Sequence, residues 1–391
     1  MVTSEGIIMK HTIGWLLPAS LATLAFVPAC SPHHGEDAPA VTSAESGAAP
    51  SADCVALGAK LQAALDGAAA AQKAPGAAAA VQSGDCVWRG ATGVSDLVAN
   101  TPTKPGDLFR IGSITKTFVA TLILMLRAEG RLSLDDAVSK YVQGIPAGDQ
   151  MTLRQILGHT SGLFDYIYSP AFGQIIEADP TRAFTPAELI ALATAQAPYF
   201  APGAGFRYSN TNYIVAGLVA EAVSGGTLAG LLRTRILDPV GLAHTYLDGA
   251  EPPIQGLIRG YRDYGAGLVD ITYQLSPTEA WAAGALVSNV DDLNRFFALL
   301  ISHELLSSDD LRDMTTWSPT MWPHEPGYGL GLIERDSALG SLNGHCGIIW
   351  GFQAASYGVP GSGDAITALI NRSDGDAARL VDDLAKVVKE R

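Results

Sequence analysis

The chain has 391 residues, which suits one large globular domain or two closely packed ones with a sizeable core. Hydrophobic residues make up 48% of the chain and charged residues 16%, so its body should fold. The formal net charge is −14 and no basic stripe stands out, which argues against a nucleic-acid partner. This excess of acidic residues is more typical of a solvated surface than of a binding site.

An apolar run near the N-terminus predicts a secretory signal over residues 1–29. It follows Lys10 and His11, and its length of about 17 residues is short for a bilayer span, which needs about 20. The run ends before Cys30, and both lipidation of this cysteine and ordinary signal cleavage remain open. Residues 30–53 are expected to form a flexible tether. We therefore expect an exported protein that is periplasmic, extracellular or lipid-anchored, and that reaches a membrane only through such an anchor.

The four cysteines fall into different contexts. Cys30 belongs to the signal region, and Cys346 lies far along the chain. Cys54 and Cys86 lie in the exported part, where disulfides persist, so the sequence favours a disulfide between them over two unpaired buried thiols. That pairing would leave Cys346 as a free thiol.

The exported part opens with a predicted helix and a predicted hairpin. Residues 55–71 are alanine-rich and helical in pattern. Residues 76–93 form two short apolar runs split by Ser-Gly-Asp at 83–85, which is a hairpin signal. Helical periodicity follows over residues 114–128 and stops at Gly130.

The middle of the chain, about 131–280, shows short helical patterns joined by Pro/Gly loops, and the C-terminal part returns to strands. The clearest later helices are predicted over 210–225 and 290–306. The strand candidates and the closing amphipathic helix cover 328–335, 344–359, 364–373 and 377–390, respectively. This order indicates an α+β plan in which the first and last parts share one antiparallel sheet.

Ser113 and Lys116, in the stretch FRIGSITKTF (109–118), make the first chemical motif. Residues i and i+3 share one face of a helix, so the hydroxyl and the amine can meet. A serine hydroxyl is a weak nucleophile until a base takes its proton, and a lysine can do this when burial lowers its pKa. Taken alone, the spacing fits a capping serine and a solvated lysine better.

Tyr208 and Asn210, in FRYSNTNY (206–213), make the second motif just before a predicted helix. In an extended loop, residues two apart point to the same side, so both could reach the serine and the lysine. Tyr208 beside a cation could act as a phenolate-like base. A helix entry capped by Asn210 or Thr211 is the plainer alternative.

His345 and Cys346 stand between glycines in GHCGIIWG (344–351), the third motif. A metal site, a cysteine nucleophile and strand packing are each compatible with this pair. Adjacent strand residues face opposite ways, so the two side chains should not act on one ligand. The sequence predicts no metal site and no cofactor, because other histidines are scattered without ligand spacing: His159, His244, His303 and His324.

Taken together, Ser-x-x-Lys, Tyr-x-Asn and His-x-Gly in this order resemble the signature of the serine β-lactamase and penicillin-binding-protein clan. The spacing is similar to its class C-like branch, which includes D-alanyl-D-alanine carboxypeptidases, class C β-lactamases and family VIII esterases. Supporting stretches lie at 156–166, 282–297 and 327–332, so the resemblance spans roughly 54–390. In character it is nearest to the exported D-alanyl-D-alanine carboxypeptidases.

The resemblance implies a β-lactamase/transpeptidase-like fold, with an antiparallel sheet flanked by helices plus a mostly helical subdomain. It makes residues 54–391 one serine hydrolase domain. The α/β part would comprise about 54–112 and 281–391, and the helical part about 113–280.

The resemblance also implies roles for the motif residues. Ser113 would be the nucleophile that forms an acyl-enzyme. Lys116 and Tyr208 would share the acid–base work, in a division that the sequence leaves open. Asn210 would hydrogen-bond Lys116 and the substrate amide, and His345 would support Tyr208 electrostatically.

The same resemblance places the oxyanion hole at the backbone N–H groups of Ser113 and Ile348. Gly347 would be required because a side chain there would keep the substrate from the strand. The related carboxypeptidases hold the terminal carboxylate of their substrate with hydroxyl residues and an arginine. Here those positions carry Cys346, Ile348 and Ile333, so the expected carboxylate clamp is mostly absent.

Two nearby side chains bear on the specificity that this departure implies. Arg335 lies two residues past Ile333 and could compensate as a carboxylate ligand, while Trp350 would favour an apolar or aromatic group. Losing charge-assisted hydrogen bonds of such a clamp would cost roughly 1.5–3 kcal/mol each. We therefore expect a specificity shifted toward esters, neutral D-amino-acid amides or D-peptides.

Three functions are compatible with these motifs. The first is a serine acyl hydrolase of the carboxypeptidase or esterase type, the second a β-lactamase, and the third a penicillin-binding sensor without turnover. The presence of Ser113, Lys116 and Tyr208 argues against the sensor, and histidine at position 345 in place of lysine argues against the β-lactamase. The expected partners are small-molecule or peptide substrates, such as peptidoglycan stem peptides or β-lactams.

Overall fold

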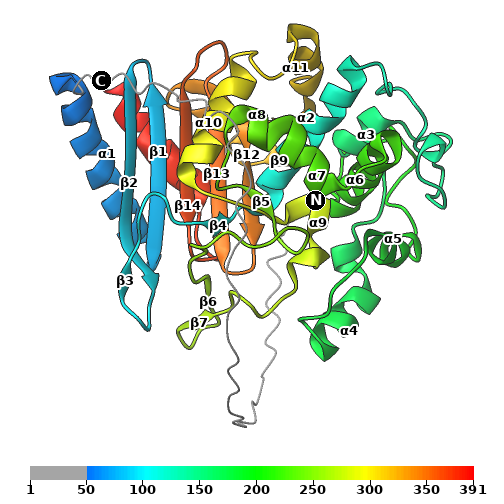
Figure 1. Ribbon diagram of the computed structural model, residues 1–391, viewed down its shortest axis with the longest axis horizontal. Helices are drawn as coiled ribbons and strands as arrows, with labels where there is room; N and C mark the ends of the chain where they lie inside the picture. The colour runs from blue at the N-terminus through cyan, green and yellow to red at the C-terminus, as the bar shows by residue number, and fades with distance from the viewer. Residues whose placement is uncertain (1–50) are drawn as a thin grey trace, which may run out of the picture. The chain divides into compact units, whose positions relative to one another are not determined.

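A nine-stranded antiparallel sheet lies at the centre of the computed structural model, which describes residues 51–391 (Figure 1). The predicted signal over 1–29, Cys30 and most of the predicted tether lie outside the described residues. The strands follow the order β3-β2-β1-β14-β13-β12-β11-β10-β9. Their bounds are β1 Gly76–Ser83, β2 Cys86–Asp96, β3 Thr101–Pro102, β9 Ser318–Trp322, β10 Glu325–Tyr328, β11 Ile333–Ser337, β12 Gly340–Ile349, β13 Phe352–Gly358 and β14 Ala365–Ile370.

The first and last parts of the chain meet in this sheet, as the sequence predicted. Strand β1 pairs with β14 from Ala77 opposite Ile370 to Gln82 opposite Ala365. The predicted α+β class, with an antiparallel sheet flanked by helices, is confirmed. The long connection between β1–β2 and β9–β14 carries most of the helices.

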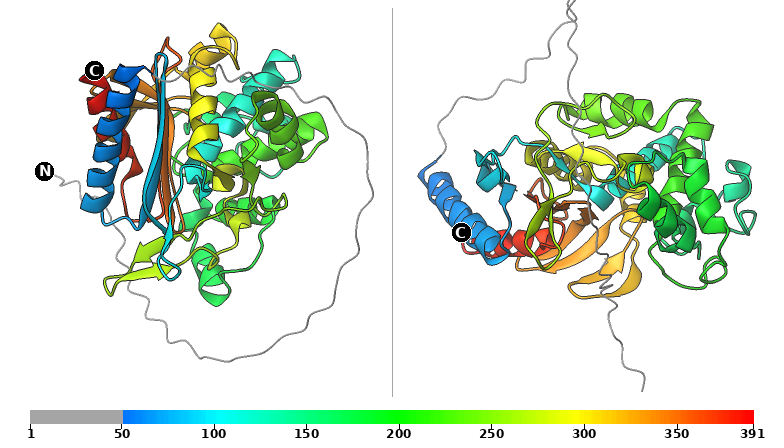
Figure 2. Two further views of the ribbon diagram at one scale, coloured as in Figure 1. Left: turned by 60° about the vertical axis from the view of Figure 1, so that its left-hand side comes forward. Right: turned by 90° about the horizontal axis from the view of Figure 1, so that it is seen from below.

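Helices cover both faces of the sheet (Figure 2). Helices α1 (Ala52–Ala71) and α12 (Ala377–Lys389) lie on one face, and α10 (Val290–Ile301) lies on the other. The central strands β1, β13 and β14 are therefore buried almost throughout. Strands covered on both sides read as continuous apolar runs rather than alternating ones, which explains the alanine-rich β1. Helix α1 begins inside the last residues of the predicted tether, where the Ser51 side chain caps it.

Three predicted boundaries differ from the structure. The run 328–335 holds the end of β10, a turn over 329–332 in which Gly331 has a φ of 74°, and the start of β11. The run 344–359 is the hairpin β12–β13, with Gly351 at a φ of 82°. Glycine adopts this left-handed conformation without strain, so it allows a sharp turn inside an apolar run. The predicted helix 290–306 ends at Ile301, just before residue 303, which is also left-handed.

The helical part packs beside the sheet on the side of α10 (Figures 1 and 2). Its central element is α2 (Thr115–Ala128), which is buried along most of its length. The other helices here are α3 Leu153–Leu157, α4 Pro170–Ala178, α5 Pro186–Thr194, α6 Asn210–Ser224, α7 Leu228–Leu232, α8 Asp238–Val240, α9 Trp281–Gly284 and α11 Ser308–Met314. Within residues 51–391, no single helix has the length and apolarity of a membrane span, although α6 and α7–α8 pass that test as a pair bent by 77°.

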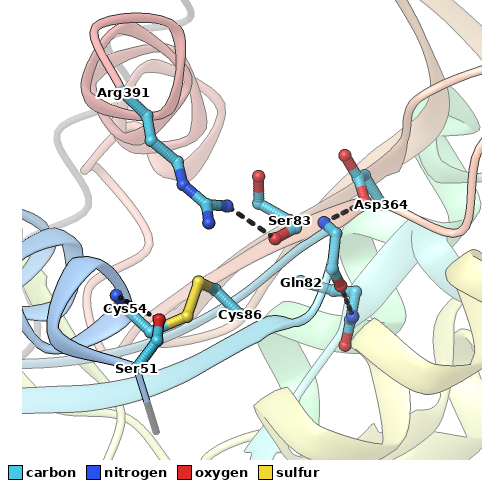
Figure 3. The surroundings of a disulfide bond; sticks show 8 residues. Ser51, Cys54, Gln82, Ser83, Cys86, Asp364 and Arg391 are labelled. Atoms are coloured by element: carbon cyan, nitrogen blue, oxygen red, sulfur yellow. Dashed lines mark hydrogen bonds between the residues drawn. A yellow bond between two sulfur atoms is a disulfide. The ribbon is translucent and has the colours of Figure 1, made fainter.

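A disulfide joins α1 to β2 through Cys54 and Cys86 (Figure 3). The two Cα atoms are 5.3 Å apart and the cysteines are separated by 32 positions. Near it, the Arg391 guanidinium donates to the Ser83 carbonyl at the end of β1. Disulfides of this kind are typical of proteins outside the reducing cytosol.

Candidate active site

Ser113 and Lys116 lie at the point where the chain enters the helical part. Ser113 belongs to a short 3-10 turn, Gly112–Ile114, that leads into α2, and Lys116 lies in the first turn of that helix. The Lys116 Nζ atom is 2.9 Å from Ser113 Oγ. Ser113 is half-buried and Lys116 is fully buried. The predicted i, i+3 pair therefore meets, with the amine placed to take the hydroxyl proton.

Two glycines allow the backbone before α2 to lie directly against β12. A Cβ atom on Gly347 would come within 2.0 Å of the Ile111 carbonyl oxygen and 2.7 Å of the Ser113 amide nitrogen. A Cβ atom on Gly112 would lie 2.9 Å from the Ile348 amide nitrogen. This backbone contact by itself requires glycine at position 347, and the substrate clearance that the sequence suggested stays a prediction. The contact also brings the Ser113 and Ile348 amides to the same small region, as an oxyanion hole requires.

Burial governs the protonation of Lys116. It lowers the pKa of this amine to about 7, although the nearby Asp165 carboxylate opposes the shift. The remaining contacts of Nζ are the Asn210 Oδ1 atom at 2.8 Å and the Ala283 carbonyl at 2.6 Å. At neutral pH a substantial fraction of this lysine is therefore the free amine, which can act as a base.

Asn210 connects the lysine to a carboxylate that the motifs did not reveal. Its Oδ1 accepts from Lys116, and its Nδ2 donates to Asp165 Oδ2 at 3.1 Å. Burial raises the pKa of Asp165 to about 6, and the bonds from Asn210 and Ile167 oppose this shift. Asp165 lies within the family-like stretch 156–166, but only the fold shows that it faces the site. The two Asn210 contacts fix the orientation of its amide group.

Tyr208 is half-buried, and the Lys116 Nζ atom lies 4.9 Å from the centre of its ring. Burial raises the pKa of the phenol well above its ordinary value, and a hydrogen bond with Ser113 only partly offsets that. The phenolate-like base that the sequence suggested does not fit this environment at neutral pH. The neutral phenol can instead donate a proton.

His345 contacts Tyr328 rather than Tyr208. One ring nitrogen, Nδ1, lies against the Cys346 carbonyl, which can only accept, so Nδ1 carries the proton. The other, Nε2, therefore accepts from the Tyr328 hydroxyl at 3.2 Å. Burial lowers the pKa of His345 to about 3. A neutral ring whose centre lies 6.5 Å from that of the Tyr208 ring would supply no charge, which argues against the expected electrostatic support of Tyr208.

The His159 ring packs against the Tyr208 ring. Its ring centre lies 4.2 Å from that of Tyr208 and 4.7 Å from that of Tyr328. Its Nδ1 accepts from the Ser209 backbone N–H at 3.2 Å and from Asn212 at 2.9 Å. These contacts give His159 a structural role, because they hold the loop that carries Tyr208.

Cys346 and Arg335, which the sequence suggested as substrate-binding residues, contact carboxylates of the protein itself. The Arg335 guanidinium is buried and bonds Asp382 at 2.9 and 2.6 Å and Glu325 at 2.8 Å. Cys346 Sγ lies 3.9 Å from Glu325 Oε1, on the face of β12 opposite His345. Burial, followed by the Glu325 charge, raises the pKa of the thiol to about 12. Arg335 is therefore a structural cation, and Cys346 a neutral thiol beside it.

Trp350 and Ile348 border the site after the oxyanion position. The Ile348 side chain is 64% exposed, so it can contact a substrate. Trp350 is half-buried, and its indole N–H donates to Glu279 at 3.2 Å. Within residues 51–391, no cluster of three or more His, Cys, Asp or Glu side chains could hold a metal ion.

The fold and the Ser113–Lys116–Asn210 geometry are those of a serine hydrolase related to penicillin-binding proteins. A family model described as Beta-lactamase matches residues 61–389, and the chain belongs to this family.

Solved structures and curated proteins with several activities are similar to this chain. The D-stereospecific amidohydrolase from Streptomyces sp. is 33% identical, with a TM-score of 0.76 over 84% of this chain and 98% of its own. The D-amino acid amidase from Ochrobactrum anthropi SV3 is 27% identical, with a TM-score of 0.79 over 86% and 99%. Esterase EstB from Burkholderia gladioli is 31% identical over 214 residues, which cover 52% of this chain and 54% of the esterase.

Proposed function

We propose that the protein is an exported serine acyl hydrolase that forms an acyl-enzyme on Ser113 and acts on esters or D-amino-acid amides. The observation that carries the proposal is the buried Lys116 amine 2.9 Å from Ser113 Oγ, with a pKa near neutrality. The site resembles that of D-alanyl-D-alanine carboxypeptidases, so penicillins are expected to label Ser113. The amidase and esterase relatives support the choice of substrate class.

The geometry suggests how the proton moves. Neutral Lys116 takes the proton of Ser113 as its oxygen attacks the substrate carbonyl, and the Ser113 and Ile348 amides stabilise the resulting oxyanion. The tetrahedral intermediate collapses to the acyl-enzyme and expels the alcohol or amine. Tyr208 donates its phenolic proton to this leaving group and regains one from protonated Lys116. Water then attacks the acyl carbon and releases the acid.

Charge on the leaving-group side supports esters and neutral amides over peptides with a free terminal carboxylate. Arg335, the cation that could have held such a carboxylate, already bonds Asp382 and Glu325. An anionic leaving group would therefore enter without a compensating partner.

The disulfide supports export, because such bonds form in oxidising compartments. The same proposal assigns a signal function to residues 1–29 and allows a lipid on Cys30. Mass spectrometry of the secreted or membrane fraction would identify the mature N-terminus and any acyl group on Cys30.

Purified protein would be tested with a nitrophenyl ester, D-phenylalanine amide, nitrocefin and a D-Ala-D-Ala peptide, with a fluorescent penicillin as label. The expected result is turnover of the ester and the amide that Ser113→Ala abolishes and Ser308→Ala, at an exposed serine, retains. Rapid nitrocefin turnover would instead establish a β-lactamase. Stable labelling without any turnover would establish a sensor. Full activity in Ser113→Ala would contradict the mechanism.

A further inference from the structure

Glu279 is a buried acid at the site that the mechanism above does not use. It is the last residue of the 3-10 turn Pro277–Glu279, just before α9, and it is 6% exposed. Its backbone carbonyl accepts from the Tyr166 hydroxyl at 2.5 Å, which fixes the main chain there. Four residues later, the Ala283 carbonyl accepts from Lys116. The acid therefore stands on a rigid segment that also contacts the catalytic amine.

Only one oxygen of the Glu279 carboxylate has a protein partner. Oε1 accepts from the Trp350 indole N–H at 3.2 Å. In the part of the chain that the structure describes, Oε2 accepts no hydrogen bond and forms no ion pair, and it is not among the fully buried atoms that lack a partner, so it remains open to solvent or a ligand. A buried carboxylate without a cation is costly, so the fold would be expected to provide one or to take one from a ligand.

The cations nearest to Glu279 bond to other groups of the protein. Arg110 bonds Asp248 at 3.1 Å and the Thr272 carbonyl. Lys116 contacts three oxygen atoms that do not include Glu279, and its amine is needed in the neutral form. Burial raises the pKa of Glu279 to about 7, as expected for an acid that lacks a cationic partner. A cationic ligand group would restore the ionised form.

Glu279 lies on the acyl side of the site. Tyr208, which would protonate the leaving group, is close to His345, before the oxyanion amide of Ile348 on β12. Trp350, which holds Glu279, comes after that amide. A substrate that places its carbonyl oxygen at the Ile348 amide and its leaving group toward Tyr208 therefore directs its acyl part toward Trp350 and Glu279.

We propose that the Glu279 carboxylate binds the α-ammonium group of the substrate's acyl residue, so that the protein prefers amino acyl substrates with a free α-amino group. This inference rests on the proposed acyl hydrolase function and narrows its substrate class. The ammonium would donate to Oε2, while Trp350 holds Oε1. N-acylation of the substrate removes the charge and adds bulk, so it should remove the preference.

The test compares D-phenylalanine 4-nitroanilide with its N-acetyl derivative, and uses 4-nitrophenyl butyrate as a substrate without an amine. In the wild type, the free-amine anilide should show a kcat/KM roughly 10- to 100-fold above that of the acetylated one. Glu279→Gln should reduce this ratio toward one, with the loss mainly in KM. Glu177→Gln, at an exposed glutamate of α4, should keep the wild-type ratio.

A second measurement uses the wild-type protein alone and therefore does not depend on the folding of a variant. D-phenylalaninol should inhibit butyrate hydrolysis competitively, and N-acetyl-D-phenylalaninol should do so roughly 10-fold more weakly. Equal kcat/KM for the two anilides, or equal inhibition by the two alcohols, would overturn the role of Glu279 and leave the acyl hydrolase standing. Absence of butyrate and anilide turnover in the wild type would overturn both proposals.

Discussion

Two buried basic side chains of this protein have opposite surroundings. Lys116 touches only uncharged oxygen atoms, those of Ser113, Asn210 and the Ala283 carbonyl. Arg335, 5% exposed, bonds carboxylates of Glu325 and Asp382 directly. The nearest acid to Lys116 in its hydrogen-bond network, Asp165, is separated from it by the Asn210 amide.

This difference explains why Lys116 can act in catalysis while Arg335 stabilises the fold. Direct carboxylate partners outweigh burial and raise the pKa of Arg335, so it keeps its proton under all conditions. Burial without a direct acid lowers the pKa of Lys116 to about 7, so it can give up and take back a proton. The Asn210 spacer keeps Asp165 close enough to orient the network but too far to hold the lysine charged. Substitutions at the two cations should therefore fail in different ways.

Replacement of Lys116 should cause the largest loss of activity. Lys116→Met keeps the apolar stem but removes the base, so ester kcat should fall roughly 10²- to 10⁴-fold. The melting temperature should change little, because the variant also removes a buried amine. Lys140→Met, at an exposed lysine, is the matched control. An active Lys116→Met variant would assign the base to another group.

Replacement of Arg335 should instead lower stability. Arg335→Leu leaves Glu325 and Asp382 without their cation, which should reduce the free energy of unfolding by roughly 3 kcal/mol. This is the low end for a buried pair, because the Asp382 side chain keeps 22% exposure. Ester kcat per folded molecule should stay near the wild-type value. Urea unfolding would measure the loss, with Arg312→Leu, in an exposed pair, as the neutral control.

The pH profile should report the lysine and not the arginine. The base must be unprotonated, so kcat/KM for a nitrophenyl ester should rise up to about tenfold per pH unit below pH 7 and level off above it. His345 cannot produce this limb, because its pKa is lowered to about 3. Rates measured from pH 5 to 9 would show it. A profile that is flat down to pH 5 would contradict Lys116 as the base.

Local spacing was enough to predict the pairs that lie close in the chain. Ser113 and Lys116 are three residues apart on one helical turn, and their side chains meet. Asn210 reaches Lys116 from the start of α6, where the motif placed it. The α+β plan followed from the order of hairpin, helices and strands, because that order alone limits how the sheet can close.

Local spacing could not predict the groups whose role depends on burial. Asp165 and Glu279 carry no motif, and each becomes notable only when the fold removes it from water and brings it close enough to Lys116 for their charges to interact. Alternation along β12 correctly predicted opposite faces for His345 and Cys346. It could not say what each face meets, because β10, β13 and α12 supply those neighbours from elsewhere in the chain. The partners of Arg335 were missed for the same reason.

A substitution at Cys346 tests this limit of prediction from sequence, and its expected effect is the smallest of those described. The sequence suggested that it replaces a substrate-binding hydroxyl, in which case Cys346→Ser should restore D-alanine release from a D-Ala-D-Ala peptide. In the structure its sulfur faces Glu325, so a serine there would donate to that carboxylate. We therefore expect D-alanine release and ester turnover to change by no more than about threefold. A tenfold gain in D-alanine release, measured by a coupled D-amino-acid oxidase assay, would show that residue 346 contacts the substrate after all. No change in D-alanine release would instead attribute the altered specificity to the exposed Ile348 and to Arg335, which already bonds a carboxylate of the protein.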